Sequence, residues 1–177
     1  MNPINSIISQ YWFVDQFVVA SSSLLLDSLY LMLLFSIARK RKVIRVLPFA
    51  LMYIIRFAIQ HLCYLPTPKN YVWNRPSVPS LTIFYEPVGD FYPSGHVALS
   101  VLAFLYFRRL DKQVLAKFAT VCTIYQILVL LATNSHYCID ILGGATLGYT
   151  SWHITRKYTF PCKHGKRTII LRPSKQD

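Results

Sequence analysis

Long apolar runs alternate along this chain with short clusters of Lys and Arg. A helix that spans a membrane needs about 20 mostly apolar residues, so runs of this kind are candidate spans. Five runs reach or approach that length. They cover residues 17–37, 43–64, 94–107, 115–133 and 139–154. The pattern therefore predicts an all-α, multi-pass transmembrane helical bundle with five spans.

The third and fifth runs are shorter than a usual span. Short spans are typical of helices whose outer ends are buried in protein around a recessed site. The chain then divides into an outer N-terminal segment, a transmembrane domain that carries the candidate chemistry, and a basic cytosolic tail. These parts cover residues 1–16, 17–155 and 156–177. Residues 4–13 form a further apolar stretch, and whether it is an extra membrane segment is left open by the sequence.

Composition and charge support a membrane protein. With 54% apolar and 15% charged residues, the chain has too little polar surface for a soluble globular protein of 177 residues. The net charge of +12 could indicate nucleic-acid binding, but 16 of the 19 basic residues lie in three clusters, at 39–45, 108–117 and 156–175. Such clusters mark cytosolic loops. The C-terminus is therefore expected in the cytosol, and the N-terminus and residues 65–92 and 134–137 on the opposite, lumenal or extracellular face; no nucleic-acid partner is expected.

His136 and Asp140 stand four residues apart at the start of the fifth predicted span. On a helix this spacing places both side chains on one face, within hydrogen-bonding reach. A carboxylate that accepts from one ring nitrogen fixes the tautomer, aims the other nitrogen outward and stabilises a positively charged ring. The pair therefore suits a catalytic role in which His136 is the nucleophile and Asp140 orients its ring. The simpler interpretation is a satisfied polar pair that closes a helix end.

Residues 93–96 read Pro-Ser-Gly-His at the start of the third predicted span. Pro93 favours a break before the helix, Ser94 can cap it, and Gly95 lets a ligand approach the backbone. Free N–H groups and the positive helix end suit a phosphate there, and His96 could protonate a leaving oxygen. The alternative is an ordinary helix start with an incidental histidine.

Three cations lie outside the basic clusters, and each of them could contact the phosphate of a ligand. Lys69 and Arg75, in the predicted outer loop, are natural clamps for phosphate oxygens, unless they only keep the loop solvated. Arg56 lies inside the second span, where a charge is costly and therefore a functional hint. It either pairs with Asp27 of the first span or reaches an anionic ligand. Three outer segments thus indicate one phosphate-directed chemistry.

At these residues the chain resembles the type 2 phosphatidic acid phosphatase superfamily, with its KxxxxxxRP, PSGH and SRxxxxxHxxxD motifs. The Ser-Arg pair is absent, because Val129 and Leu130 stand there instead. In this respect the chain is similar to the sphingomyelin synthase family, whose third motif reads HYxxD. The matching segments are residues 69–76 (one residue short of the superfamily spacing), 93–96 and 136–140, together with 89–96 for GDYxxSGH and Arg56 with 65–68 for R-x8-LPxP.

The resemblance implies a lipid phosphotransferase that works by double displacement at a lumenal or extracellular site. His136 would take the phospho head group as nucleophile, Asp140 would orient it, and His96 would serve as acid and later as base, supported by Asp90. The expected phosphate-binding residues are Ser94, Gly95, Arg75, Lys69 and Arg56. The family fold has six helices, one more than the spans predicted here.

The resemblance also implies the partners. The donor would be a phospholipid that carries phosphocholine or a similar head group, and the acceptor a lipid alcohol such as ceramide. No cofactor or metal is expected, and the oligomeric state is not indicated. The first alternative is a lipid phosphate phosphatase that uses the same site with water as acceptor.

Two further alternatives stay open at this point. His96, His136 and Asp140 could instead hold a catalytic zinc ion, which needs three protein ligands and an open position. Otherwise the chain is a non-catalytic membrane protein whose histidines only form hydrogen bonds at helix ends.

Overall fold

The computed structural model describes residues 12–39, 42–63, 80–81 and 92–160, and within them the only regular elements are helices. The prediction of an all-α bundle is confirmed. The helices are α2 (Trp12–Ala38), α3 (Leu47–Leu62), α4 (Gly95–Arg109), α5 (Gln113–Ala132) and α6 (Cys138–Thr159), and the short 3-10 helix η1 (Val43–Val46) precedes α3.

Each predicted span corresponds to a helix, but several boundaries differ. The second span is divided into η1 and α3, and Pro48 lies in the first turn of α3, where its missing N–H costs nothing. α2 begins at Trp12, inside the segment expected to precede the first span. α6 continues to Thr159, beyond the expected boundary at residue 155. Apolar runs therefore locate the helices but do not mark their ends, because polar residues continue a helix outside the apolar layer.

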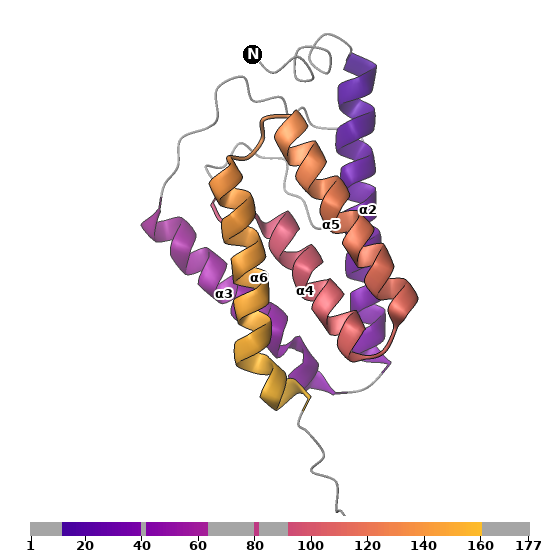
Figure 1. Cartoon of the computed structure of the whole chain (residues 1–177), viewed down its shortest axis with the longest axis vertical. Coiled ribbons are helices and arrows are strands. Elements are labelled where there is room, and N and C mark those ends of the chain that lie inside the picture. Colours follow the sequence, from indigo (N-terminus) through magenta and orange to yellow (C-terminus); the bar gives the residue numbers. More distant parts are fainter. Residues whose placement is uncertain (1–11, 40–41, 64–79, 82–91, 161–177) are drawn as a thin grey trace, which may run out of the picture.

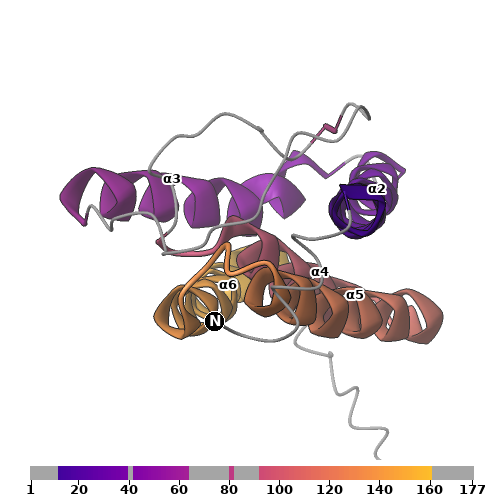
Figure 2. The same ribbon diagram turned by 90° about the horizontal axis from the view of Figure 1, so that it is seen from above.

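The helices form two layers. α4, α5 and α6 lie side by side in one layer, and α2 and α3 cover it from the other side (Figures 1 and 2). α4 is the central helix, with extensive contacts to α5 on one side and α6 on the other. α3 packs on α6, and α2 on α5.

The central position of α4 explains its short length. Its 15 residues span about 22 Å, less than the ~30 Å hydrocarbon core of a bilayer. Leu102, Ala103, Tyr106 and Phe107 are fully buried, so protein rather than lipid surrounds the helix. In Figure 1, α4 begins below the upper ends of α2 and α5, as expected for a recessed site.

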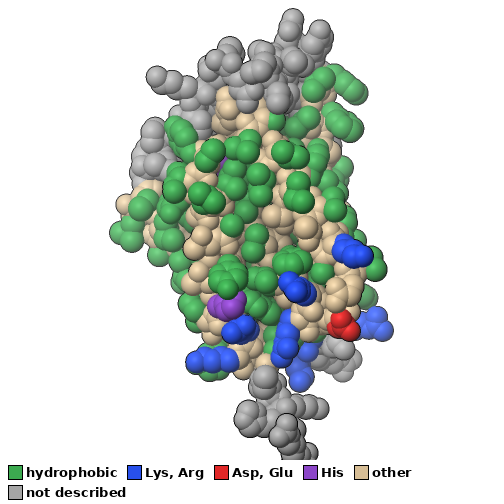
Figure 3. All heavy atoms as spheres, in the orientation of Figure 1, with side chains coloured by type: hydrophobic (Ala, Val, Ile, Leu, Met, Phe, Trp, Pro, Cys, Tyr) green, Lys and Arg blue, Asp and Glu red, His purple; other side chains and the backbone are tan. Residues whose placement is uncertain are grey.

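The outer surface is suited to a membrane. Large apolar side chains cover the middle of the molecule, whereas Lys and Arg gather at its lower end (Figure 3). Among the described residues, three helical segments are long and apolar enough to cross a membrane: Gln16–Ala38, Val43–Leu62 and Gln113–Ala132. These segments correspond to the first, second and fourth predicted spans.

Polar side chains join α2 to α5 inside the bundle. Ser22 Oγ donates to Gln126 Oε1 (2.8 Å), and Gln126 Nε2 donates back to the carbonyl oxygen of Ser22 (2.8 Å). The hydroxyls of Ser21 and Tyr125 lie 2.6 Å apart. Such interhelical hydrogen bonds stabilise helix association in lipid, where apolar burial supplies little driving force.

Glycines allow α4 and α6 to approach at the level of their backbones. A Cβ atom at Gly148 would lie 2.5 Å from the carbonyl oxygen of Ala98, and one at Gly144 would lie 2.4 Å from that of Ser94. Both distances are too short for real Cβ contacts, and the opposing atoms belong to the backbone. The spacing of four residues is the small-xxx-small pattern of close helix pairs.

We therefore expect Gly148→Ala to destabilise the bundle, because the added methyl group forces α4 and α6 apart. The cost should be roughly 1–3 kcal/mol, the usual range for overpacking. It would be measured as a lower unfolding temperature of the purified protein in detergent. Thr146→Ala, at an exposed position of the same helix, is the matched control. Equal stability of the two variants would show that this contact does not hold the helices together.

Candidate active site

The two histidine motifs meet where α4 and α6 begin. The N–H of Ser94 donates to the carbonyl oxygen of Asp140 (3.0 Å), and the carbonyl oxygen of Ser94 faces Gly144. Both helix starts lie at the end of the bundle opposite the basic residues (Figures 1 and 3). Segments about 40 residues apart in the chain are thus joined by their backbones.

His136 and Asp140 are arranged as their spacing predicts. His136 Nδ1 lies 3.4 Å from Asp140 Oδ2, and the Asp140 side chain is fully buried. The same carboxylate oxygen accepts a hydrogen bond from the N–H of Tyr137 (2.8 Å), which anchors the carboxylate in the first turn of α6. With Nδ1 toward the carboxylate, Nε2 lies on the opposite side of the ring. The 3.4 Å separation is longer than a strong charge-assisted bond, as is common in catalytic sites without substrate.

His96 lies across from His136. The ring centroids are 6.3 Å apart and the ring planes are inclined at 69°. A nucleophile approaches phosphorus at about 3–3.5 Å, and a general acid lies about 2.6–3.2 Å from the oxygen it protonates. The two rings therefore border the same space, and both are close enough to contact a single phosphoryl group.

The start of α4 differs in detail from the prediction. Ser94 is the N-cap residue, but its side chain makes no capping hydrogen bond. The fully buried hydroxyl has no partner among the described residues. Backbone contacts with α6 hold Ser94 in place. The expected capping role of this side chain is therefore wrong, and the hydroxyl remains as a polar group within the site.

Gly95 makes room for a side chain rather than only for a ligand. A Cβ atom there would lie 3.0 Å from Arg56 Nε and 3.1 Å from Cζ. Arg56 Nε also donates to the carbonyl oxygen of Pro93 (3.1 Å). The guanidinium thus lies at the positive end of α4, so a single anion could meet both.

The two alternatives for Arg56 and Asp27 can now be compared. Asp27 Oδ1 accepts from the hydroxyl of Ser80 (3.1 Å), and its Oδ2 accepts from the N–H of Leu81 (3.0 Å). Arg56 lies against Pro93 and Gly95. These contacts connect Asp27 to the segment between α3 and α4 and place Arg56 at the site, which favours the ligand-facing interpretation of Arg56.

Three predicted site residues, Lys69, Arg75 and Asp90, lie outside the described residues. Their roles remain predictions. Within the described ranges, no three His, Cys, Asp or Glu side chains are grouped so that they could hold a metal ion. The donor arrangement that the zinc alternative requires is thus not found there.

Sequence reasoning missed the groups that assemble the site. These are the N–H groups of Tyr137 and Ser94, and the glycines that let α6 approach α4. The spacing of Gly144 and Gly148 was a usable signal, because small residues four apart mark close helix packing. The backbone hydrogen bonds left no signal, since every residue carries the same groups.

Fold and site together define a helical protein with membrane-length segments and a paired-histidine site suited to a phosphate. A family model described as AtPDCT1/2 matches residues 2–157, nearly the whole chain, so the chain belongs to this family. A relative in Arabidopsis thaliana, phosphatidylcholine:diacylglycerol cholinephosphotransferase 2, is 30% identical over 111 residues. The match covers 60% of this chain but only 35% of the relative. No solved structure matches the chain.

The carboxylate of Asp140 is expected to have a structural role that can be separated from its chemistry. Asp140→Ala removes the acceptor for the N–H of Tyr137, and an unsatisfied buried donor costs about 1–3 kcal/mol. Asp140→Asn keeps an acceptor oxygen and should unfold closer to the wild-type temperature. Thermal unfolding of both variants in detergent measures this difference. If both variants unfold alike, the bond to Tyr137 does not stabilise the start of α6.

Proposed function

We propose that this chain is an integral membrane phosphotransferase that moves phosphocholine, or a similar head group, from a phospholipid to a lipid alcohol. The observation that carries the proposal is the proximity of His96 and His136, whose ring centroids are 6.3 Å apart, with Asp140 beside Nδ1 of His136. Membership of the AtPDCT1/2 family and the relative named as a cholinephosphotransferase support it.

The first half of the reaction forms a phospho-histidine. His136 Nε2 attacks phosphorus, the bond from phosphorus to the glycerol oxygen breaks, and His96 gives that oxygen a proton. Diacylglycerol leaves. Asp140 stabilises the positive charge that develops on the His136 ring. Arg56 and the N-terminal end of α4 stabilise the charge on the phosphate oxygens, assisted by Ser94 and Gly95.

The second half reverses these roles with a different alcohol. His96, now neutral, removes the proton from the incoming hydroxyl, whose oxygen attacks phosphorus. The phosphorus–nitrogen bond breaks and His136 is restored. The name of the relative favours diacylglycerol as acceptor, and the resemblance to sphingomyelin synthases favours ceramide. With phosphatidate as donor and water as acceptor, the same site would make the chain a lipid phosphate phosphatase.

The charge distribution supports a topology for the bundle. The site and the Lys and Arg side chains that gather at the lower end of Figure 3 lie at opposite ends of the molecule (Figures 1 and 3), and basic clusters mark the cytosolic side. We therefore place the site at the lumenal or extracellular face, within a transmembrane catalytic domain of residues 17–155. The segments 1–16 and 156–177 then flank this domain on the outer and the cytosolic side.

Liposomes containing the protein and head-group-labelled phosphatidylcholine test the activity directly. With diacylglycerol or ceramide added separately, we expect label in new phosphatidylcholine or in sphingomyelin, and no transfer by His136→Ala. His153→Ala, at the basic end of α6, is the matched control and should retain activity. Phosphate release from phosphatidate, with no transfer from phosphatidylcholine to either alcohol, would support the phosphatase alternative, and full activity of His136→Ala would reject the histidine mechanism.

The separate roles of the two histidines can be tested with p-nitrophenyl phosphocholine, whose leaving group needs no proton. His96→Ala should still release p-nitrophenol in a burst of about one equivalent, because only its acid is missing. His136→Ala should give no burst, because the nucleophile is missing. Rapid-mixing absorbance measures both. Equal defects in the two variants would contradict this division of roles.

Asp140→Asn should lower the rate of transfer by roughly 10²–10⁴-fold, because an amide neither fixes the His136 tautomer as a carboxylate does nor stabilises the charged ring. The measurement is the initial rate in the liposome assay at matched amounts of folded protein. Asp111→Asn, in the turn between α4 and α5, should leave the rate unchanged. A wild-type rate for Asp140→Asn would exclude its role as orienter.

A further inference from the structure

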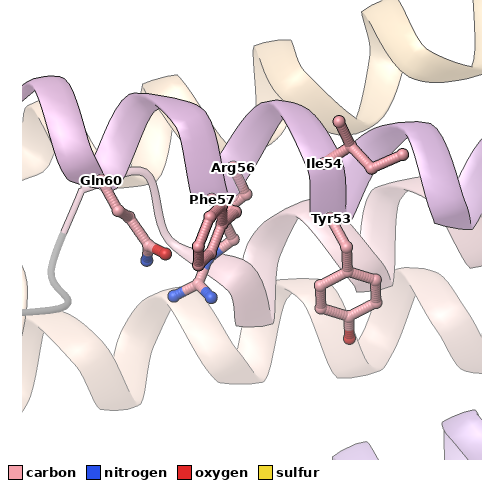
Figure 4. A pocket seen from close by; sticks show the side chains of 5 residues that line it. All are labelled: Tyr53, Ile54, Arg56, Phe57 and Gln60. Atoms are coloured by element: carbon pink, nitrogen blue, oxygen red, sulfur yellow. The ribbon is translucent and has the colours of Figure 1, made fainter.

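One face of α3 borders a cavity of about 390 Å³ next to the site. Tyr53, Ile54, Arg56, Phe57 and Gln60 line it. In Figure 4 the side chains of Gln60, Arg56, Phe57 and Tyr53 leave α3 on the same side. The volume falls within the range of about 300–1,000 Å³ that is usual for small-molecule sites.

The cavity combines one cation with otherwise uncharged side chains. Arg56 also lies at the start of α4, so one end of the cavity reaches the site. Ile54 and Phe57 are 65% and 64% exposed, so the other part opens toward the surroundings of the bundle. In a membrane this opening faces acyl chains. The cavity thus connects the lipid layer with the phosphate-directed end of α4.

Gln60 adds a buried polar group to the lining of this cavity. Its amide nitrogen is buried and has no hydrogen-bond partner among the described residues. An unsatisfied buried donor is costly, so a ligand that supplies an acceptor would be favoured at this position. Gln60 follows Arg56 by four residues, and side chains at this spacing are neighbours on one face of a helix.

We propose that this face of α3 binds a diacyl glycerophospholipid that enters the bundle sideways from the lipid layer. This proposal rests on the proposed function, and it names the groups of the donor lipid that the protein recognises. Arg56 meets the phosphate, the amide of Gln60 donates to an ester carbonyl oxygen, and Tyr53 and Phe57 contact the acyl chains. Gln60 lies one helical turn from Arg56 on this face of α3, so the amide and the guanidinium can contact groups that are close together, as the phosphate and the ester carbonyls are in the lipid.

Ester-linked and ether-linked phosphatidylcholine test the proposal, because only the ester lipid has the carbonyl acceptor. Binding is measured with purified His136→Ala, which transfers nothing, so the result does not depend on turnover. We expect this protein to bind the ester lipid roughly 3- to 10-fold more tightly than the ether lipid. Adding Gln60→Leu should abolish the preference, and adding Gln113→Leu, at the exposed start of α5, should preserve it.

The outcomes separate this inference from the proposed function. Loss of the ester preference in the Gln60→Leu protein supports the inference even if wild-type protein transfers no head group. The inference is overturned if the Gln60→Leu protein keeps the ester preference, or if the protein that retains Gln60 shows no such preference. The inference is also overturned if the preference for ester over ether linkage depends on Gln60 with diacylglycerol but not with phosphatidylcholine. This face of α3 would then recognise a lipid that has no phosphate.

Discussion

The close contact between α4 and α6 is the constraint on which the rest of the structure depends. Gly144 and Gly148 have no side chain, so the backbones approach within a distance that a Cβ would prevent. The N–H of Ser94 then reaches the carbonyl oxygen of Asp140, and this bond joins two helix starts. Because each start carries a histidine, one backbone contact sets the distance across which the two rings face each other.

Burial of α4 follows from the same constraint. A helix enclosed by protein does not have to match the thickness of a bilayer, so α4 can be short and can begin below the ends of its neighbours. Its positive end then lies within the bundle, next to Arg56 of α3 and the start of α6. Electrostatic interactions are stronger there than in water, which makes the helix end, Arg56 and the histidines more effective toward an anion.

The lipid-binding face that we propose on α3 would connect this recessed site to the membrane. A lipid substrate has a charged head group and apolar chains, so its site must meet both the polar end of α4 and the acyl layer. Arg56 lies at the junction, with the cavity on one side and Gly95 on the other. A phospholipid could therefore present its phosphate to the histidines while its chains remain among apolar side chains, without leaving the bilayer completely.

The sequence by itself determined the all-helical class, the approximate positions of the helices and the His136–Asp140 pair, because hydrophobic run length and helical spacing are local properties. It also placed the basic clusters that distinguish the two ends of the molecule. Only the tertiary structure decided that Ser94 is held by its backbone, that Gly95 accommodates Arg56, and that Gln60 borders a cavity beside the site. These features arise where segments distant in the chain meet, and no local pattern records which atoms a buried backbone or guanidinium will contact.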